Sequence, residues 1–414
     1  MIICGTDLSE ASRRALDVAC ALASQRGEPE VVLVHAVEDL EGAELAERKA
    51  RLAAKAAAQP GVRGELIVGP PDEALVRFAE TAGADLIVVA ARSRGDKLGT
   101  TAGNIITRTH VPVIAVRDPA PWLAFARGER PLRLLLGVDE AATAELAVQW
   151  THGLALRGTL DVVLGTIYYP DDAAAYYGLP AHGFVESDPE SERLLQRDMI
   201  RRFSGAASPA RSVTAVARRG LGRIGDHIIE LASEQAVDAI VIGTSQKTGL
   251  GRLGSVSSIV VEEAAQSVVC VPPHAAITTQ SVPVLQQALV ATDLSQFANR
   301  AVPYAFALTV PTGDIHLLHV VKEDDDTTVD DAALLAQLAQ LAPAGAPQRV
   351  HAHVVRGDDT ATTIAQCAAR FGVDVICVAS HGRSGLTRAL VGSVADRLLR
   401  ATRLPVLVLR PGET

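Results

Sequence analysis

The chain has 414 residues, of which 48% are apolar and 3% aromatic, and its formal charge is −9 at pH 7. At about 100–200 residues per domain, this length predicts two to four domains, whose cores Ala, Val and Leu must build, as in a parallel sheet covered by helices. The negative charge argues against a broad nucleic-acid surface, which needs a basic patch, although it leaves room for one nucleotide held by backbone amides.

The first residues run straight into an apolar strand, so we expect no signal peptide. No apolar run approaches the ~20 residues that a membrane span needs. The five cysteines are an odd number, and three of them lie in apolar strand segments. Buried thiols of this kind are typical of a reducing compartment, and we expect a cytoplasmic protein.

A short apolar strand that ends in aspartate opens the chain, and the same feature returns twice. The three segments are Ile2–Asp7, Leu134–Asp139 and Leu289–Asp293. A helix rich in small residues follows each of them, and Ser9 and Ser295 are suited to cap the helices of copies 1 and 3. The chain is therefore predicted to be a triple repeat.

Strands and helices alternate through the rest of each copy. The most apolar strand comes fourth, at 86–90, 239–242 and 375–378. Each copy closes on a short strand, at 111–116, 267–271 and 404–409. Such alternation predicts parallel strands joined by right-handed crossovers.

The repeats predict three domains, 1–118, 131–274 and 287–414, with linkers at 118–130 and 274–286. The second domain carries an insertion at about 170–206, which holds two tyrosine pairs near its start. Two interpretations of the insertion stay open: a lid over the crevice of copy 2, or a segment packed between domains.

Copy 3 contains a glycine loop between its fourth strand and its last helix. The pattern is Ala379-x2-Gly382-x9-Gly392-Ser393. Glycines let the main chain approach phosphate oxygens closely, and Ser393 begins a helix whose positive end favours an anion. The loop thus predicts a polyphosphate site, although the same residues also fit a role in turning the chain and capping the helix.

Several short motifs together resemble the universal stress protein family. They are Thr292-Asp293-x-Ser295, Gly357, Ser380-His381-Gly382, Gly392-Ser393-Val394 and Pro405-Val406-Leu407-Val408. The resemblance covers nearly the whole chain as three tandem copies. It implies an α/β fold of three tandem open, parallel, five-stranded sheets, each in strand order 3-2-1-4-5 with helices on both faces, of the adenine-nucleotide alpha-hydrolase-like kind.

The resemblance also implies a site for ATP, with Mg²⁺, in copy 3. It places Ala291, Thr292 and Asp293 beside the adenosine and Val320 against the base. The remaining candidate residues surround the loop: Val378, Ala379, His381, Gly382, Gly392, Ser393 and Val394. Ala379 replaces the first glycine of the family motif.

The loops of the other two copies are degraded. Copy 2 has Gly243-x2-Gln246-x7-Gly254-Ser255, which is two residues shorter than the motif. Copy 1, aligned as Ala90-x2-Ser93-x9-Gly103-Asn104, retains one motif glycine, with Asn104 as a helix cap. We therefore expect one tight nucleotide site per chain, in copy 3.

The favoured function is an ATP-binding regulatory or stress-resistance module without catalytic residues. The sequence lacks the signatures of nucleotidyl-transferring relatives and a Gly-x4-Gly-Lys-Ser/Thr loop, and His381 is the single candidate base in the copy 3 loop. The alternatives are a slow ATP-hydrolysing or nucleotidyl-transferring enzyme and a scaffold that binds nothing. The histidines His316, His319, His351 and His353 lie on neighbouring strands, and we interpret them as sheet-edge residues rather than metal ligands.

The last strand of each copy would leave an apolar sheet edge, which proteins normally cover. The resemblance implies that these strands pair between domains. With three copies, two pair within the chain and the third pairs in a homodimer. Copies 1 and 3, which are most alike, are the tentative internal pair, although adjacency in the sequence favours copy 1 with copy 2.

Overall fold

The structure is a computed structural model that forms two compact units. One unit contains Met1–Tyr168 and Leu195–Ser281, and the other contains Tyr169–Leu194 and Val282–Thr414. The described residues are 1–27, 30–38, 42–91, 100–139, 142–180, 188–204, 210–244, 255–273, 275, 284–322, 330–379 and 392–410.

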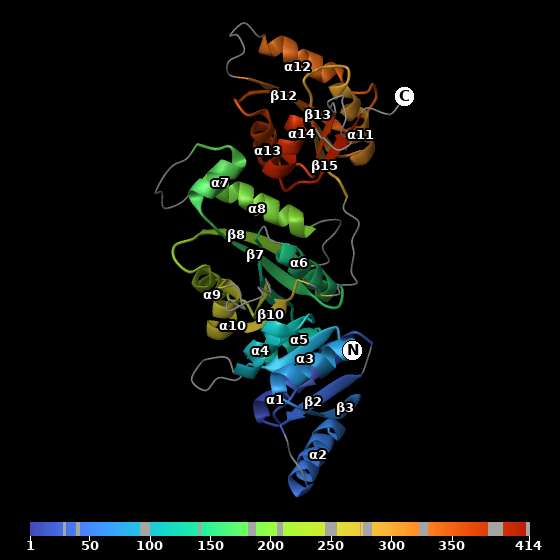
Figure 1. Cartoon of the computed structure of the whole chain (residues 1–414), viewed down its shortest axis with the longest axis vertical. Helices are drawn as coiled ribbons and strands as arrows, with labels where there is room; N and C mark the ends of the chain where they lie inside the picture. The colour runs from blue at the N-terminus through green and yellow to red at the C-terminus, as the bar shows by residue number, and fades with distance from the viewer. Residues whose placement is uncertain are drawn as a thin grey trace, which may run out of the picture. The chain divides into compact units, whose positions relative to one another are not determined.

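Copy 1 forms one half of the sheet in the first unit (Figure 1). Its parallel strands run in the order β3-β2-β1-β4-β5. Their bounds are β1 Ile2–Gly5, β2 Val31–Val37, β3 Val62–Val68, β4 Leu86–Ala90 and β5 Val113–Val116. The helices are α1 Glu10–Gln25, α2 Gly42–Ala57, α3 Pro71–Thr81 and α4 Thr100–Arg108. Ser9 caps α1 as predicted, because its hydroxyl accepts from the Ser12 amide.

Copy 2 repeats this arrangement, with strand order β8-β7-β6-β9-β10. The strands are β6 Leu132–Gly137, β7 Leu160–Tyr168, β8 Ser212–Arg219, β9 Ala239–Gly243 and β10 Ser267–Val271. The helices are α6 Ala142–Ala155, α8 Pro189–Ser204, α9 Ile224–Glu234 and α10 Ser255–Glu263.

The two sheets of the first unit are continuous, so copies 1 and 2 form the internal pair, as adjacency in the sequence favours, and the expected pairing of copies 1 and 3 is wrong. Strand β5 pairs antiparallel with β10, with Ile114 opposite Val269, and the ten strands form one sheet. Every residue of both strands is buried. The pairing thus removes the two apolar edges at which these copies would otherwise end.

The predicted linker 118–130 contains a helix, α5 (Ala120–Ala126), that the sequence interpretation missed. Its Trp122 and Phe125 are almost fully buried, at 0% and 1% exposure. Helix α5 packs against α1, and a side chain at Gly158 would collide with the Phe125 ring at 2.5 Å. The segment is therefore part of the core rather than a spacer.

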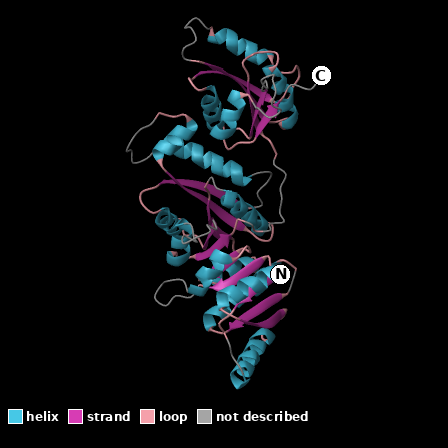
Figure 2. Cartoon of the chain, viewed as in Figure 1, coloured by secondary structure: helices cyan, strands magenta, loops and turns pink. Residues whose placement is uncertain are grey.

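Copy 3 lies in the second unit, where helices flank its strands (Figure 2). Its five parallel strands run in the order β13-β12-β11-β14-β15. The strands are β11 Gln287–Ala291, β12 Asp314–Val321, β13 Arg349–Arg356, β14 Val375–Ala379 and β15 Val406–Leu409. The helices are η1 Ala298–Arg300, α11 Ala301–Leu308, α12 Asp331–Gln340, α13 Thr360–Phe371 and α14 Ser393–Ala401. The Ser295 hydroxyl accepts from the Ala298 amide, but the N-cap of η1 is Phe297, so the predicted cap at Ser295 is wrong.

Helices cover both faces of this sheet, as the apolar composition of the strands predicts. Alternate residues of each strand enter two separate cores, since successive side chains point to opposite faces. Leu318 and Ile376 pack with α13 and α14, whereas Leu317 and Cys377 pack with α11 and α12.

The insertion of copy 2 begins with α7 (Pro170–Tyr177), which packs against α13 of copy 3. The Gln366 side-chain amide donates to the Ala175 carbonyl at 3.1 Å. At the end of α7, Gly178 adopts a left-handed φ of 64° directly against the Gln366 side chain. This part of the insertion therefore belongs structurally to copy 3.

None of the helices that the structure describes combines the length and the apolar character needed to cross a bilayer.

Candidate functional site

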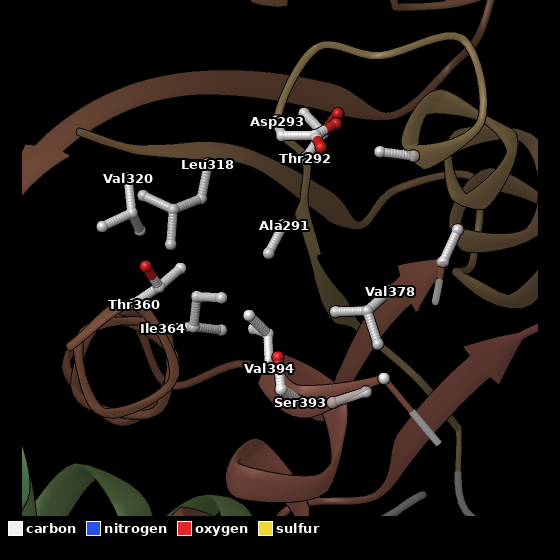
Figure 3. A pocket seen from close by; sticks show the side chains of 14 residues that line it. Ala291, Thr292, Asp293, Leu318, Val320, Thr360, Ile364, Val378, Ser393 and Val394 are labelled. Atoms are coloured by element: carbon white, nitrogen blue, oxygen red, sulfur yellow. The ribbon is translucent and has the colours of Figure 1, made fainter. Parts of the chain in front are cut away.

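A pocket of about 280 Å³ opens at the carboxyl ends of β11 and β14 in copy 3 (Figure 3). This is where the strand order reverses, which is the usual ligand position in an open α/β sheet. Every predicted site residue that the structure describes lines it: Ala291, Thr292, Asp293, Val320, Val378, Ala379, Gly392, Ser393 and Val394. The two other predicted residues, His381 and Gly382, lie outside the described residues.

Five further residues line the pocket and were missed from the sequence: Ala298, Leu318, Thr360, Ile364 and Ala395. Leu318 lies two residues before Val320 on β12, so the period of a strand could have identified it. Thr360 and Ile364 are one helical turn apart at the start of α13, and their orientation depends on how that helix packs.

One end of the pocket is a tight loop after β11. The Thr292 amide donates to the Leu318 carbonyl at 3.0 Å, and the Thr292 hydroxyl accepts from the Leu294 amide at 2.9 Å. The Asp293 carboxylate accepts from the Ser295 amide at 2.9 Å. Leu294 has a left-handed φ of 64°, which is costly for a leucine and needs this network to hold it.

The Asp293 carboxyl group stays ionised at neutral pH. Partial burial pushes its pKa upward, but hydrogen bonds from the Ser295 side chain and backbone outweigh this effect and leave the pKa below its usual value. The pocket therefore has a fixed acceptor at its rim, suited to a hydroxyl donor such as that of a ribose.

The middle of the pocket is apolar. Leu318, Val320 and Ile364 face the hollow from one side, and Val378 faces it from the other (Figure 3). Such walls suit a flat, weakly polar ring, because most of a ligand's buried surface meets apolar side chains.

The other end of the pocket is the start of α14. Gly392 is the N-cap of this helix and supplies no side-chain hydrogen bond to the first-turn amides, and Ser393 is the first helical residue. Helix N-termini of this kind favour anions, since their amides point outward and the helix dipole is positive there. The pocket thus joins a polar rim, an apolar middle and an anion-favouring end.

The other copies align differently from the sequence interpretation. Helix α4 begins at Thr100, so Asn104 lies inside it and the predicted cap at Asn104 is wrong. Thr100, which follows Gly99, is therefore the counterpart of Ser393. Helix α10 begins at Ser255, as its glycine-serine pair predicts. The connection from the fourth strand is shorter in copy 2 than in copy 3, as predicted, and shortest in copy 1, where equal spacing with copy 3 was expected.

In copy 2, the last turn of the insertion contacts the loop after the first strand. Arg202 of α8 donates to the Asp139 carbonyl and, at 3.0 Å, to the Glu145 carboxylate. His152 of α6 contacts the Phe203 carbonyl at 2.6 Å. The end of the insertion thus lies beside Asp139, the counterpart of Asp293.

Comparison with known proteins identifies the family. The sequence matches the universal stress protein family over residues 1–117, 132–272 and 285–410. The chain belongs to the universal stress protein family. It is 32% identical over 199 residues to a universal stress protein of Mycobacterium tuberculosis, a match that covers 44% of this chain and 64% of that protein. The chain thus spans just under two thirds of this curated relative.

Two further proteins of known sequence or structure are similar to this chain. A universal stress protein of Mycolicibacterium smegmatis is 25% identical over 291 residues, covering 67% of this chain and 97% of that one. The crystal structure of a universal stress protein from Archaeoglobus fulgidus covers 66% of this chain and 98% of its own, at 17% identity and a TM-score of 0.48.

Proposed function

We propose that this universal stress protein binds ATP in the copy 3 pocket and acts as a nucleotide-responsive regulatory or stress-resistance module in the cytoplasm. The observation that carries the proposal is the convergence of three features in one pocket: the Asp293 loop, the apolar walls and the start of α14. Adenosine fits the first two, and the phosphates fit the third.

Mg²⁺ enters this proposal as a partner of the phosphates. Mg²⁺ keeps several waters and binds readily through substrate phosphates rather than through a cage of protein ligands. Among the described residues, no group of three or more His, Cys, Asp or Glu side chains is arranged to hold a metal ion. The expected role is therefore charge neutralisation along the phosphate chain.

Binding without rapid turnover is the second part of the proposal. Within the described pocket residues, Asp293 is the one ionisable side chain, and it lies at the opposite end from the start of α14 (Figure 3). A general base must lie within hydrogen-bond reach of the proton that it removes. We therefore expect phosphate release from ATP to be slow compared with nucleotide exchange.

Isothermal titration calorimetry of the full chain with ATP and Mg²⁺ tests the proposal. We expect one tight site per chain, because copy 3 has the longest loop and keeps the motif spacing with its Gly392-Ser393 pair. Three equivalent sites would contradict the assignment to copy 3, and the absence of any binding would contradict the nucleotide function itself.

A further inference from the structure

His319 lies outside the nucleotide pocket and contacts the loop that forms one end of it. Its Nδ1 lies 2.8 Å from the Thr292 carbonyl oxygen, and because a carbonyl only accepts, Nδ1 must carry the proton and donate. His319 is not among the residues that line the pocket, whereas Leu318 and Val320 on either side of it are. This alternation places the imidazole on the opposite face of β12.

The carbonyl that His319 holds belongs to the peptide bond between Thr292 and Asp293. Rotation of this peptide would move the Asp293 carboxylate at the pocket rim. The loop is also strained, since Leu294 has a left-handed φ, and strain persists only where several contacts determine the conformation. The imidazole supplies one of these contacts from a rigid strand.

Copy 1 reproduces this arrangement in full. His35 Nδ1 lies 2.8 Å from the Thr6 carbonyl, and Leu8 has a φ of 63°. The Leu8 amide donates to the Thr6 hydroxyl at 2.9 Å, as the Leu294 amide does to Thr292. The same imidazole thus accompanies the same strained Thr-Asp-Leu-Ser loop in both copies.

Copy 2 provides the contrast. Its Val138 amide donates to the Gly165 carbonyl, which is the counterpart of the Thr292–Leu318 hydrogen bond. The next residue on β7 is Thr166, so no imidazole occupies this position. The loop after β6 is contacted instead by Arg202 of the insertion.

We propose that His319 is a positioning residue of the nucleotide site, which fixes the Thr292–Asp293 peptide so that the Asp293 carboxylate faces the ligand. This inference rests on the proposed ATP binding. His319 itself touches no ligand, and its effect on affinity passes through the loop alone.

Three variants of the full chain test the inference by titration with ATP and Mg²⁺. His319→Leu removes the donor, and we expect about tenfold weaker binding, which corresponds to ~1.4 kcal/mol. His319→Asn places its amide nitrogen where Nδ1 was and keeps a donor, so we expect affinity within about threefold of the parent chain, or ~0.7 kcal/mol. His35→Leu makes the same change in copy 1 and is the matched control, with no expected loss of affinity.

Thermal unfolding of the variants separates positioning from general stability. A purely structural role predicts that His319→Leu and His35→Leu lower stability alike without a selective loss of affinity. Unchanged ATP affinity in His319→Leu, equal weakening in His319→Asn, or equal weakening in His35→Leu would overturn the inference. Failure of the parent chain to bind ATP would instead overturn the proposed function.

Discussion

Gly392 is the residue at which side-chain size and charge should matter most for binding. Its φ of −57° is ordinary, so other residues can adopt it, and aspartate is a favourable N-cap. In Gly392→Asp, however, a carboxylate would lie where the phosphates approach α14. Repulsion between unit charges ~4 Å apart costs about 1–4 kcal/mol at effective dielectric constants of about 80 to 20. We expect ATP affinity to fall at least about tenfold while α14 remains folded, as measured by calorimetry and circular dichroism.

The matched control for this substitution is Gly254→Asp, at the same position before α10 in copy 2. It should leave the tight site unchanged, because we assign that site to copy 3. Wild-type affinity in Gly392→Asp, or equal losses in the two variants, would contradict the assignment of the phosphate end.

Residues with a chemical signature were predictable from the sequence, and residues without one were not. Asp293, Gly392 and Ser393 stand at fixed spacings that the anion and turn chemistry require, and the structure places them in one pocket. Ile364 and Ala395 are ordinary apolar residues on helices, and their place in the pocket depends on tertiary packing. Asn104 was wrongly assigned as the cap of α4, because the loop of copy 1 is shorter and no residue in the sequence marks the resulting shift of the motif.

At the scale of elements, a stack of rings joins β12, β13 and α13. His316 stacks on both His351 and His353, and His353 stacks on Phe371 of α13 with ring centroids 4.2 Å apart. His316 Nδ1 lies 3.0 Å from His353 Nε2, so one imidazole donates to the other. At the open end, His351 contacts Asp314, which also forms an ion pair with Arg349. The sheet-edge prediction fits His351 and His353 on β13 but is wrong for His316 and His319, because β12 is paired on both sides.

Acidification should loosen this stack. Burial, followed by the charge of His351, lowers the pKa of His353, so the folded state favours the neutral ring. The contribution of neutral His353 to folding stability is then complete above the unfolded-state pKa of about 6.5. It is lost as the pH falls through the lower pKa that His353 has in the folded state. Hydrogen bonds from Arg349 hold the pKa of Asp314 well below its usual range, so this carboxylate stays charged throughout. We expect hydrogen exchange in the β13 peptide, corrected for its intrinsic pH dependence, to become less protected between pH 7.5 and pH 5.5.

His353→Gln isolates the titrating group, because the Gln amide retains a polar partner for His316 and gains no proton. This variant should show a much smaller pH dependence in β13. A parent chain without the pH effect, or a variant with the same effect, would show that another group is responsible.

Helices α5 and α7 show why some elements escape sequence interpretation. Helix α5 is short, begins between two prolines and has no helical period to detect, yet Trp122 and Phe125 make it a core element. Helix α7 follows β7 of copy 2 in the chain but packs on α13 of copy 3. The central strands β4, β9 and β14 were predictable because each is apolar on both faces, a local property of the sequence.

At the scale of the whole molecule, the last strands of three copies leave one of their edges, that of β15, to account for. Similarity between copies could not predict the pairing of β5 with β10, because any two apolar sheet edges can pair. Which edges meet depends on how the copies are connected along the chain. Strand β15 pairs with β14 on one side, and no strand that the structure describes pairs with its other side. All four of its residues are partly exposed, whereas those of β5 and β10 are buried.

We expect two chains to pair through β15, as β5 and β10 pair within one chain. An isologous, antiparallel contact would cover both apolar edges and close the assembly as a dimer. Light scattering at micromolar concentration should then give about twice the mass of one chain. The Ile376 amide donates to the Pro405 carbonyl, so the backbone groups of the alternate residues Val406 and Val408 face away from β14. Val408→Pro removes one of these outward-facing amides. This variant should shift the equilibrium towards the monomer, and a parent chain that is strictly monomeric would exclude pairing through β15.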